Sequence, residues 1–306
     1  MRLTQLQYLL EIKKQGSISK AAQHLYIAQP SMSTAIHELE EELGYELMKR
    51  SKKGVTFTNL GEQAVEKAAA IMQEVESLRC LDEINTGHMM GRLFLSAVPF
   101  VSEHFVLDLM IALAAECPDL HLILDENDGG IVLQQVNRWE ADLGIIMICS
   151  NEEKRFQREI KKNALCFKEL YQDEICFLVG RANPNFNEKT VSMTEILRYP
   201  YVYYKESFTE EDRMLFSKYC DLSTLNTICM KDRESIKKYV VHSQATTILP
   251  AQVAQDNVYI RSGLLHALRL SDESWTCRVG IVYRKDMPLT REALFLLNRM
   301  QKMFNI

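Results

Sequence analysis

Residues 6–50 read LQYLLEIKKQGSISKAAQHLYIAQPSMSTAIHELEEELGYELMKR, and their hydrophobic spacing predicts three short helices. Leu6, Leu9 and Leu10 recur at helical spacing, with Thr4 as the cap in front of them, and Gly16 ends this first helix. Ser17 can cap a second helix, and Pro30 stands in the first turn of a third. The stretch therefore predicts a first helix followed by two short helices that are joined by a tight turn.

The predicted third helix has one apolar face and one small polar face. Met32, Ile36 and Leu39 fall on one stripe, whereas Thr34 and His37 point the opposite way. Small hydroxylated side chains allow a helix to approach base edges and phosphates closely. An ordinary amphipathic helix explains the stripe equally well, but it does not explain why bulky charged residues are missing from 29–36. The pattern therefore favours contact with nucleic acid.

Charge along the chain is uneven. The net charge is -5, yet residues 1–58 carry eight Lys/Arg against six Asp/Glu, which gives +2 there and -7 elsewhere. Four of those cations lie in residues 49–53, at the tip of a hairpin that the pattern predicts between 46–50 and 55–58. Such a cluster can neutralise phosphates, although a solvated loop with no partner would have the same composition.

A long helix is predicted over residues 59–87, with Asn59 as its cap. Apolar residues recur at intervals of three and four, at Leu60 and then at Ala64, Ala68, Ile71, Val75 and Leu78. A long helix with one apolar edge needs a partner, and the same helix of a second subunit is the simplest one. Packing against the C-terminal part of its own chain is the alternative.

From residue 92 onward, short strands alternate with helical stretches, which predicts an α/β domain. The predicted strands are 92–98, 120–126, 141–148, 175–180, 201–204, 225–230, 246–249 and 277–283. We place a crossover between two lobes at 150–170 and the return near 260–270.

Composition argues against several other classes of protein. With 47% apolar and 25% charged residues the chain is globular, and its start lacks a signal peptide, so we expect a cytoplasmic protein without a membrane partner. The eight cysteines form no Cys-x-x-Cys pair, so we expect no metal and no cofactor; only Cys220 and Cys229 are close enough to suggest a redox pair. No nucleophile elbow, zinc-protease motif or nucleotide-binding loop is present, which argues against an enzyme.

The run 6–50 strongly resembles the DNA-binding segment of the LysR-type transcriptional regulators. The shared residues are Gly16-Ser17-Ile18, Ala21-Ala22, Leu25, Gln29-Pro30-Ser31, Ser33, Ile36, Leu39-Glu40, Leu43-Gly44, Leu47 and Arg50, followed by Thr58 and Gly61. Weaker landmarks continue through Gly91-Arg92-Leu93, Pro118-Asp119-Leu120, 141–145 and Ile248-Leu249-Pro250. The resemblance covers essentially the whole chain.

The resemblance implies a winged helix-turn-helix in 1–58, a dimerisation helix in 59–87 and an effector-binding domain in 88–306. That domain would consist of two Rossmann-like lobes, as in periplasmic binding proteins, with lobe I at about 92–160 and 266–306 and lobe II at about 161–265. The DNA-binding residues would be Ser17, Ser19, Gln29, Pro30, Ser31, Ser33, Thr34, His37, Arg50, Lys52 and Lys53. The expected partners are an interrupted palindromic operator in double-stranded DNA, a second subunit in a dimer or tetramer, RNA polymerase and a small effector.

Three positions depart from the family pattern. Ala28 stands where a capping Ser is usual, a loss of about 1 kcal/mol. Thr34 and His37 stand where Arg or Lys is common, so the operator sequence cannot be carried over from relatives.

In a two-lobed α/β domain the ligand lies between the lobes, where strand ends and helix N-termini meet. The residues predicted there are Pro99, Phe100, Val101, Ser102, Tyr203, Tyr204, Glu206, Ser207, Thr246 and Thr247. Free N–H groups near Ser102 would favour a carboxylate, and the tyrosines could flank an aromatic acid or an amino-acid derivative. Helix capping or strand packing is the alternative for each residue, and a DNA-binding protein without an effector is the alternative for the whole chain.

Overall fold

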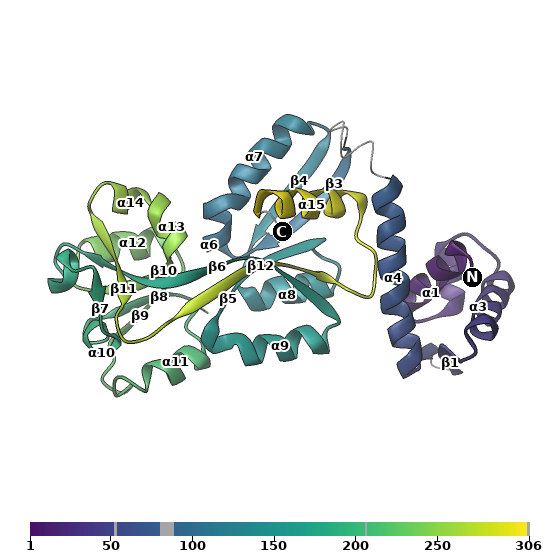
Figure 1. Cartoon of the computed structure of the whole chain (residues 1–306), viewed down its shortest axis with the longest axis horizontal. Helices are drawn as coiled ribbons and strands as arrows, with labels where there is room; N and C mark the ends of the chain where they lie inside the picture. Colours follow the sequence, from purple (N-terminus) through teal and green to yellow (C-terminus); the bar gives the residue numbers. More distant parts are fainter. Residues whose placement is uncertain (52–53, 80–88, 206, 305–306) are drawn as a thin grey trace.

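A helical N-terminal unit, one long helix and a two-lobed α/β domain follow one another along the chain (Figure 1). The computed structural model describes residues 1–51, 54–79, 89–205 and 207–304. The N-terminal unit consists of α1 (Leu3–Gln15), α2 (Ile18–His24), α3 (Gln29–Leu43) and a hairpin of β1 (Met48–Ser51) and β2 (Gly54–Phe57). Together with the long helix α4 it forms the headpiece.

The headpiece helices end and begin largely where the sequence indicates. Gly16 and Gly44 follow α1 and α3 with φ of 64° and 79°, a left-handed conformation that favours glycine. Ser17 Oγ accepts a hydrogen bond from the Lys20 N–H at 3.5 Å and so caps α2. The start of α1 differs from the prediction at Thr4: the helix begins at Leu3, and Gln5 Oε1 accepts from the Arg2 N–H at 2.8 Å.

Helix α4 (Asn59–Arg79) packs along the headpiece through one face. Thr58 caps it rather than Asn59, because Thr58 Oγ1 accepts the Gly61 N–H at 2.9 Å. Its buried residues join the core that α1, α2 and α3 form around Leu9 and Ile36; they are Val65, Ala68, Ala69 and Met72.

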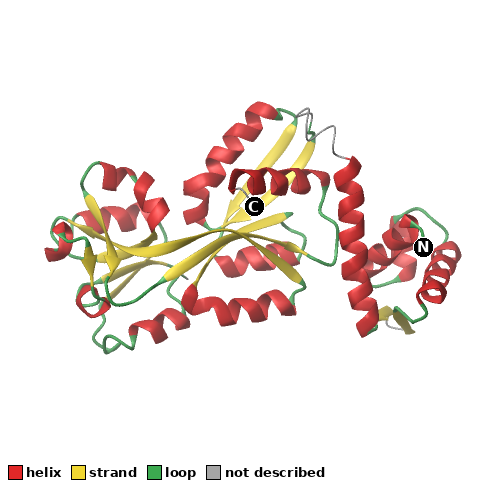
Figure 2. Ribbon diagram, in the orientation of Figure 1, coloured by secondary structure: helices red, strands yellow, loops and turns green. Residues whose placement is uncertain are grey.

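Lobe I is a sheet of strand order β4-β3-β5-β12-β6 with helices on both faces (Figure 2). Its strands are β3 (Gly91–Ala97), β4 (Leu120–Glu126), β5 (Leu143–Cys149), β12 (Thr276–Arg284) and the first part of β6 (Leu165–Gly180). Its first helix is α6 (Pro99–Val101), which a π-helix (Ser102–Val106) continues into α7 (Leu107–Glu116). The other helices are α8 (Gly129–Asn137), α9 (Glu153–Lys162) and α15 (Arg291–Phe304), and a 3-10 turn at Ser150–Glu152 leads into α9. Figure 1 shows α7 and α15 on one face, and α8 and α9 on the other.

Lobe II continues the same sheet in the order β6-β10-β8-β9, with β11 on the other side of β6 and β7 beyond it. Its strands are β7 (Thr190–Val191), β8 (Tyr201–Tyr204), β9 (Thr227–Met230), β10 (Thr246–Pro250) and β11 (Leu265–Leu270). Its helices are a 3-10 turn at Pro184–Asn187, α10 (Met193–Ile196), α11 (Glu210–Phe216), α12 (Arg233–Val241), α13 (Ala251–Asp256) and α14 (Val258–Arg261).

The strand β6 runs through both lobes, which places the crossover later than the sequence indicated. Residues 165–174 of β6 pair with β12, and residues 175–180 pair with β10 and β11. The first crossing therefore lies at 174–175 and the return at 271–275, not in 150–170 and 260–270. Residues 153–162 form the helix α9, and the whole strand β11 occupies the segment where the return had been expected.

Each lobe has a core of its own. The larger one in lobe I includes Leu93, Ile145 and Leu296, and those in lobe II include Phe177, Tyr201 and Val240. In the part of the chain that the structure describes, none of the helices combines the length and the apolar character that a membrane span requires.

Candidate effector cavity and DNA-binding face

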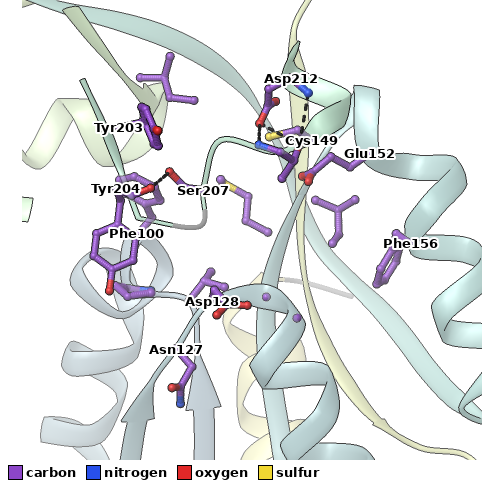
Figure 3. A pocket seen from close by; sticks show the side chains of 18 of the residues that line it. Phe100, Asn127, Asp128, Cys149, Glu152, Phe156, Tyr203, Tyr204, Ser207 and Asp212 are labelled. Atoms are coloured by element: carbon purple, nitrogen blue, oxygen red, sulfur yellow. Dashed lines mark hydrogen bonds between the residues drawn. The ribbon is translucent and has the colours of Figure 1, made fainter. Parts of the chain in front are cut away.

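A cavity of about 500 Å³ lies between the two lobes and is lined by residues of both (Figure 3). Lobe I contributes the chain after β3, the start of α8 and the junction of β5 with α9; lobe II contributes the ends of β8 and β10 and the start of α12. The volume lies within the range of about 300–1,000 Å³ that is usual for small-molecule sites.

Aromatic rings and a guanidinium form one end of the cavity, the aromatic end. Phe100 extends from lobe I, and Arg233 Cζ of lobe II lies 3.9 Å from its ring centroid and 5.3 Å from that of Tyr204. Tyr203 stands beside Tyr204 on β8, and Ser207 Oγ donates to the Tyr204 carbonyl at 2.8 Å. A stacked guanidinium keeps donors in its plane, so this end can hold an aromatic body and a carboxylate.

Carboxylates form the other end, the acidic end. Glu152 and Asp212 lie close together here beside Cys149 (Figure 3). Burial, followed by the nearby Asp212 carboxylate, raises the pKa of Glu152 to about 7. Burial also raises the pKa of Asp212 above its ordinary range, although hydrogen bonds from Thr209 oppose this shift. Arg155 is the cation that lowers the pKa of Glu152 among the residues that the structure describes, and it pairs with Glu211 at 3.3 Å. The acidic end is therefore short of positive charge.

Interlobe hydrogen bonds hold the acidic end in place. Asn151 Nδ2 of lobe I donates to Asp212 Oδ1 of lobe II at 2.8 Å. The indole Nε1 of Trp275, in the return segment between the lobes, donates to Asn151 Oδ1 at 3.0 Å. The position of Asp212 is fixed further by its role in capping α11, where its Oδ2 accepts from the Thr209 N–H at 2.8 Å. The Asp212 carboxylate is thus preorganised before any ligand enters.

Six of the ten predicted effector residues line the cavity: Pro99, Phe100, Tyr203, Tyr204, Ser207 and Thr247. Val101, Ser102 and Thr246 are buried in the lobes and do not line it. The N–H groups of Val101 and Ser102 are bonded to the Val98 carbonyl, so the expected anion site at this helix start is not formed. Glu206 lies outside the described residues.

Sequence reasoning missed the charged part of the lining. Glu152, Asp212 and Arg233 come from three segments that are far apart in sequence, and no short motif connects them. Asp128, the cap of α8, and the adjacent Gly129-Gly130 also line the cavity. An Asp followed by two glycines after a predicted strand was the one local signal that could have indicated this segment.

The predicted DNA-binding residues lie mostly on an exposed face of the headpiece. Gln29, Pro30, Ser31, Thr34 and His37 are exposed along α3, as is Ser19 on α2. Ser33 and Ser17 are half-buried, and Ser17 also caps α2. Met32, Ile36 and Leu39 are fully buried beneath the face, which anchors α3 in the headpiece core.

The strands β1 and β2 pair as the hairpin that the sequence predicted for the wing. Arg50 lies on β1 opposite Val55, while Lys52 and Lys53 at the tip lie outside the described residues. Lys49, next to Arg50, is exposed. The reasoning from sequence did not include Tyr26, whose side chain is 96% exposed in the turn before α3 at a left-handed φ of 55°. A tyrosine hydroxyl in this position is a suitable donor to a phosphate.

The predicted dimer face of α4 is partly used within the chain. Ala68 packs into the headpiece core, and Ala64 lies at the edge of that core. Ile71 and Leu78 are exposed, as is Leu60, and Val75 is half-buried. The alternative that α4 contacts its own effector domain also holds: Glu66 pairs with Lys285 at 2.8 Å, and Gln73 Oε1 accepts from the Leu289 N–H at 2.6 Å.

Seven cysteines are described as free thiols. Cys220 is half-buried near the end of α11 and Cys229 is exposed on β9. Among the residues that the structure describes, no group of three or more His, Cys, Asp or Glu is placed to hold a metal ion.

Comparison with protein families assigns both parts of the chain. The model described as "Bacterial regulatory helix-turn-helix protein, lysR family" matches residues 3–62, and the LysR substrate binding domain matches residues 86–305. The chain belongs to the LysR family. It is therefore a LysR-type DNA-binding transcription regulator with an effector-binding domain, and LysR-family proteins as a class are regulators, not enzymes.

Relatives of this LysR-type regulator match about half to nearly all of its length at 23–31% identity. The hydrogen peroxide-inducible genes activator of Dickeya chrysanthemi is 23% identical over 292 residues, which cover 94% of this chain and 91% of the relative. The nitrogen assimilation regulatory protein nac of Escherichia coli is 31% identical over 148 residues, 48% of each chain.

Solved structures confirm the fold. Full-length OxyR from Pseudomonas aeruginosa, in a variant form, has a TM-score of 0.55 at 21% identity and covers 98% of this chain and 95% of its own. The LysR-family regulator CbnR has a TM-score of 0.51 at 17% identity and covers 99% and 100%. The predicted architecture, a winged helix-turn-helix and a long helix joined to two α/β lobes, is thus confirmed.

Proposed function

We propose that this LysR-type regulator reads DNA with the exposed face of α3 and the wing, and that the interlobe cavity receives an effector carrying both a cationic and an anionic group. The observation that carries the proposal is the two-ended cavity, with carboxylates at one end and Arg233 between aromatic rings at the other. The domain division 1–58, 59–87 and 88–306 is retained, with lobe limits at 174–175 and 271–275.

The exposed residues of α3 support the DNA-binding part. Their side chains are short, so the helix backbone can approach the floor of a major groove, and Gln29 can reach an adenine edge. Two of the acidic residues of α3 are occupied away from this face: Glu38 pairs with Arg2, and Glu40 accepts the N–H groups of Leu47 and Met48 at 2.7 and 3.3 Å. Glu40 thereby ties α3 to the start of the wing.

Ser31→Glu tests this face. A carboxylate directed at the phosphates and base edges should lower affinity at least about 10-fold for duplexes selected from the source genome. Gln63→Glu makes the same change in charge on an exposed part of α4 and should leave affinity within about 2-fold. Equal losses in both variants, measured by fluorescence anisotropy, would contradict the assignment.

The two ends of the cavity define the class of effector. A protonated amine would compensate the acidic end, where Glu152, Asp212 and Glu211 outnumber Arg155. The guanidinium of Arg233 offers donors to a carboxylate, and the rings of Phe100 and Tyr204 offer apolar surface between the two ends. An amino-acid-like molecule with an aromatic or apolar body satisfies all three features.

Three small molecules separate the contributions: phenylalanine, 3-phenylpropanoate, which lacks the amine, and phenethylamine, which lacks the carboxylate. Ligands that bind only the folded state raise its melting temperature. Phenylalanine should give the largest shift in a thermal scan. Glu152→Gln should reduce the shifts given by phenylalanine and phenethylamine, and leave that of 3-phenylpropanoate unchanged.

The matched control is Glu188→Gln, because Glu188 is exposed and lies outside the cavity lining. If 3-phenylpropanoate gave the largest shift and Glu152→Gln affected none of the three, the cationic part of the effector would be ruled out. If none of the three molecules raised the melting temperature at a concentration of about 10 mM, which is sufficient for weakly binding fragment-sized ligands, the effector class would be wrong.

A further inference from the structure

Trp139 is one of the effector-domain residues that contact the headpiece. Trp139 follows α8 with a left-handed φ of 66°, a conformation that is unfavourable for a bulky side chain. Lys14 Nζ, in the last turn of α1, lies 5.3 Å from its ring centroid, and Arg284 Cζ at the end of β12 lies 4.8 Å from it. Two cations from different domains therefore share one ring. Backbone strain of this kind is usual at functional positions.

Arg284 connects Trp139 to the wall of the cavity. Its Nη1 donates to the carbonyl and to the side-chain oxygen of Asn137 at 2.8 and 2.9 Å, and Asn137 lines the cavity. Its Nε donates to Asp286 Oδ1 at 2.8 Å, and Asp286 is buried. The guanidinium is thus held between a buried carboxylate and Asn137, and it cannot shift without both of them.

Helix α8 spans the distance between the cavity and this contact. Gly129, Gly130, Leu133, Gln134 and Asn137 line the cavity along the whole helix, and Trp139 follows two residues after its end. A ligand that moves α8 therefore displaces Asn137 directly.

The neighbouring segment 285–290 also reaches the headpiece. Lys285 pairs with Glu66 and Leu289 binds Gln73, both on α4, while Met287 packs against the headpiece core. The contact at Trp139 is therefore continuous with the support of α4 described above.

We propose that Trp139 is a positioning residue through which the effector domain holds the headpiece, and that Asn137 and Arg284 link this contact to the cavity. The inference rests on the proposed effector role of the cavity. The link consists of contacts within one chain. When a ligand fills the cavity, these contacts change the orientation of α1 and with it that of the DNA-binding face.

Tryptophan fluorescence tests the contact in the full-length protein. The chain has two tryptophans, and Trp275 is buried whereas Trp139 is 46% exposed, so acrylamide quenches mainly Trp139. Trp139→Phe should remove the quenchable emission. Lys14→Ala should raise the quenching constant at least about 1.5-fold, because Lys14 covers one side of the ring. Lys67→Ala removes an exposed lysine of α4 outside this contact and should have no effect.

The cavity side of the link is tested at Asn137. Asn137→Ala removes the side-chain acceptor of Arg284 and should raise quenching of Trp139 toward the level of Lys14→Ala, whereas Asn137→Asp keeps an acceptor and should restore the wild-type value. An unchanged quenching constant in Asn137→Ala would overturn the link. An unchanged constant in Lys14→Ala would overturn the contact itself.

Failure of this inference is distinguishable from failure of the proposed function. Trp139→Phe and Lys14→Ala lie outside the cavity lining, so thermal shifts given by phenylalanine should persist in both variants. If phenylalanine still raised the melting temperature while the quenching constant of Asn137→Ala stayed at the wild-type value, the cavity would remain the effector site and only the link would be removed.

Discussion

Glu152 shows what a single residue contributes to the cavity. Its carboxylate lies near that of Asp212, in surroundings that favour a positive charge and disfavour its own ionisation. Local sequence could not reveal this, because Asp212 is 60 residues away and the bridging residue Asn151 gives no motif. The exposed face of α3 that we propose as the DNA contact could be predicted, since Gln29 to His37 follow one another on one helix whose buried and exposed positions alternate at a fixed period.

Glu152→Gln should stabilise the protein at high pH. The folded state raises the pKa of Glu152 from 4.5 to about 7, so it binds a proton that the unfolded chain has already lost between these values. The ionised carboxylate consequently costs stability as pH rises through that window, and the cost is complete above about pH 7. We expect the substitution to add about 1–2 kcal/mol to the free energy of unfolding at pH 8, after allowance for solvent screening, and little at pH 5.

Urea unfolding at the two pH values measures this difference. Glu188→Gln is the control, and it should not change the pH dependence. A gain of the same size at pH 5 and pH 8 would show that the pKa of Glu152 is not raised.

At the level of single elements, α3 lacks the side-chain N-cap that α2 and α4 have. Ala28 is the N-cap of α3 with φ -70° and ψ 131°, an extended conformation that suits a capping side chain, but it offers no acceptor. The prediction from sequence that this cap is missing is confirmed, whereas the cap of α4 was assigned to Asn59 and is Thr58. One residue of error is expected where two polar residues adjoin a helix start.

Ala28→Ser should therefore stabilise the headpiece by about 0.5–1 kcal/mol, because its hydroxyl can share the Ser31 N–H, which donates to the Ala28 carbonyl at 3.0 Å. Ala70→Ser places the same side chain at an exposed position within α4, where serine is a weaker helix former than alanine, and should destabilise slightly. Thermal unfolding of the two variants side by side measures the difference. A loss of stability in both would mean that the hydroxyl at 28 finds no partner.

Helix α4 leaves a narrow apolar edge uncovered. Leu60, Ile71 and Leu78 are spaced by 11 and 7 residues, about three and two helical turns, and so lie on one line along the helix. We propose this line as the dimer contact, in place of the broader stripe that includes Ala68. Ile71→Asp should convert an oligomer to monomer in sedimentation experiments, while Ala70→Asp, on an adjoining exposed face, should not. A monomeric wild-type protein would contradict the proposed contact.

For the whole molecule, the separation of charge governs association with DNA. Residues 1–58 carry a net charge of +2 and the remainder of the chain -7, so attraction to phosphates depends on the few cations near the DNA-binding face. Lys49→Ala should lower the slope of log affinity against log salt by about 0.9, the value for one phosphate contact. Lys161→Ala, in lobe I and exposed, is the control and should leave the slope unchanged. An unaltered slope in Lys49→Ala would mean that the wing does not touch the backbone.

The alternation of strands and helices predicted the two-lobed fold, and all but one of the predicted strands lie within a few residues of their expected limits. The exception is β6, which begins ten residues before the predicted strand 175–180, and β7 and β11 were not predicted. The junctions between lobes could not be predicted. Lys168, Glu169 and Gln172 interrupt the hydrophobic pattern of β6, because its first half lies at the lobe I surface where charged side chains pair with neighbours such as Arg278. Only the fully buried half, 175–180, has the apolar run of a strand.

The uninterrupted course of β6 limits how the regulator can respond. Since this strand is hydrogen-bonded in both lobes, no loop separates them on this side, and relative motion has to be taken up as twist along its backbone. We therefore expect rotation of the lobes by small angles about this strand rather than their separation. We accordingly expect the protein to signal by torsion delivered to the headpiece, and any inserted residue in the middle of β6 should uncouple the two halves by reversing the side-chain alternation of one of them.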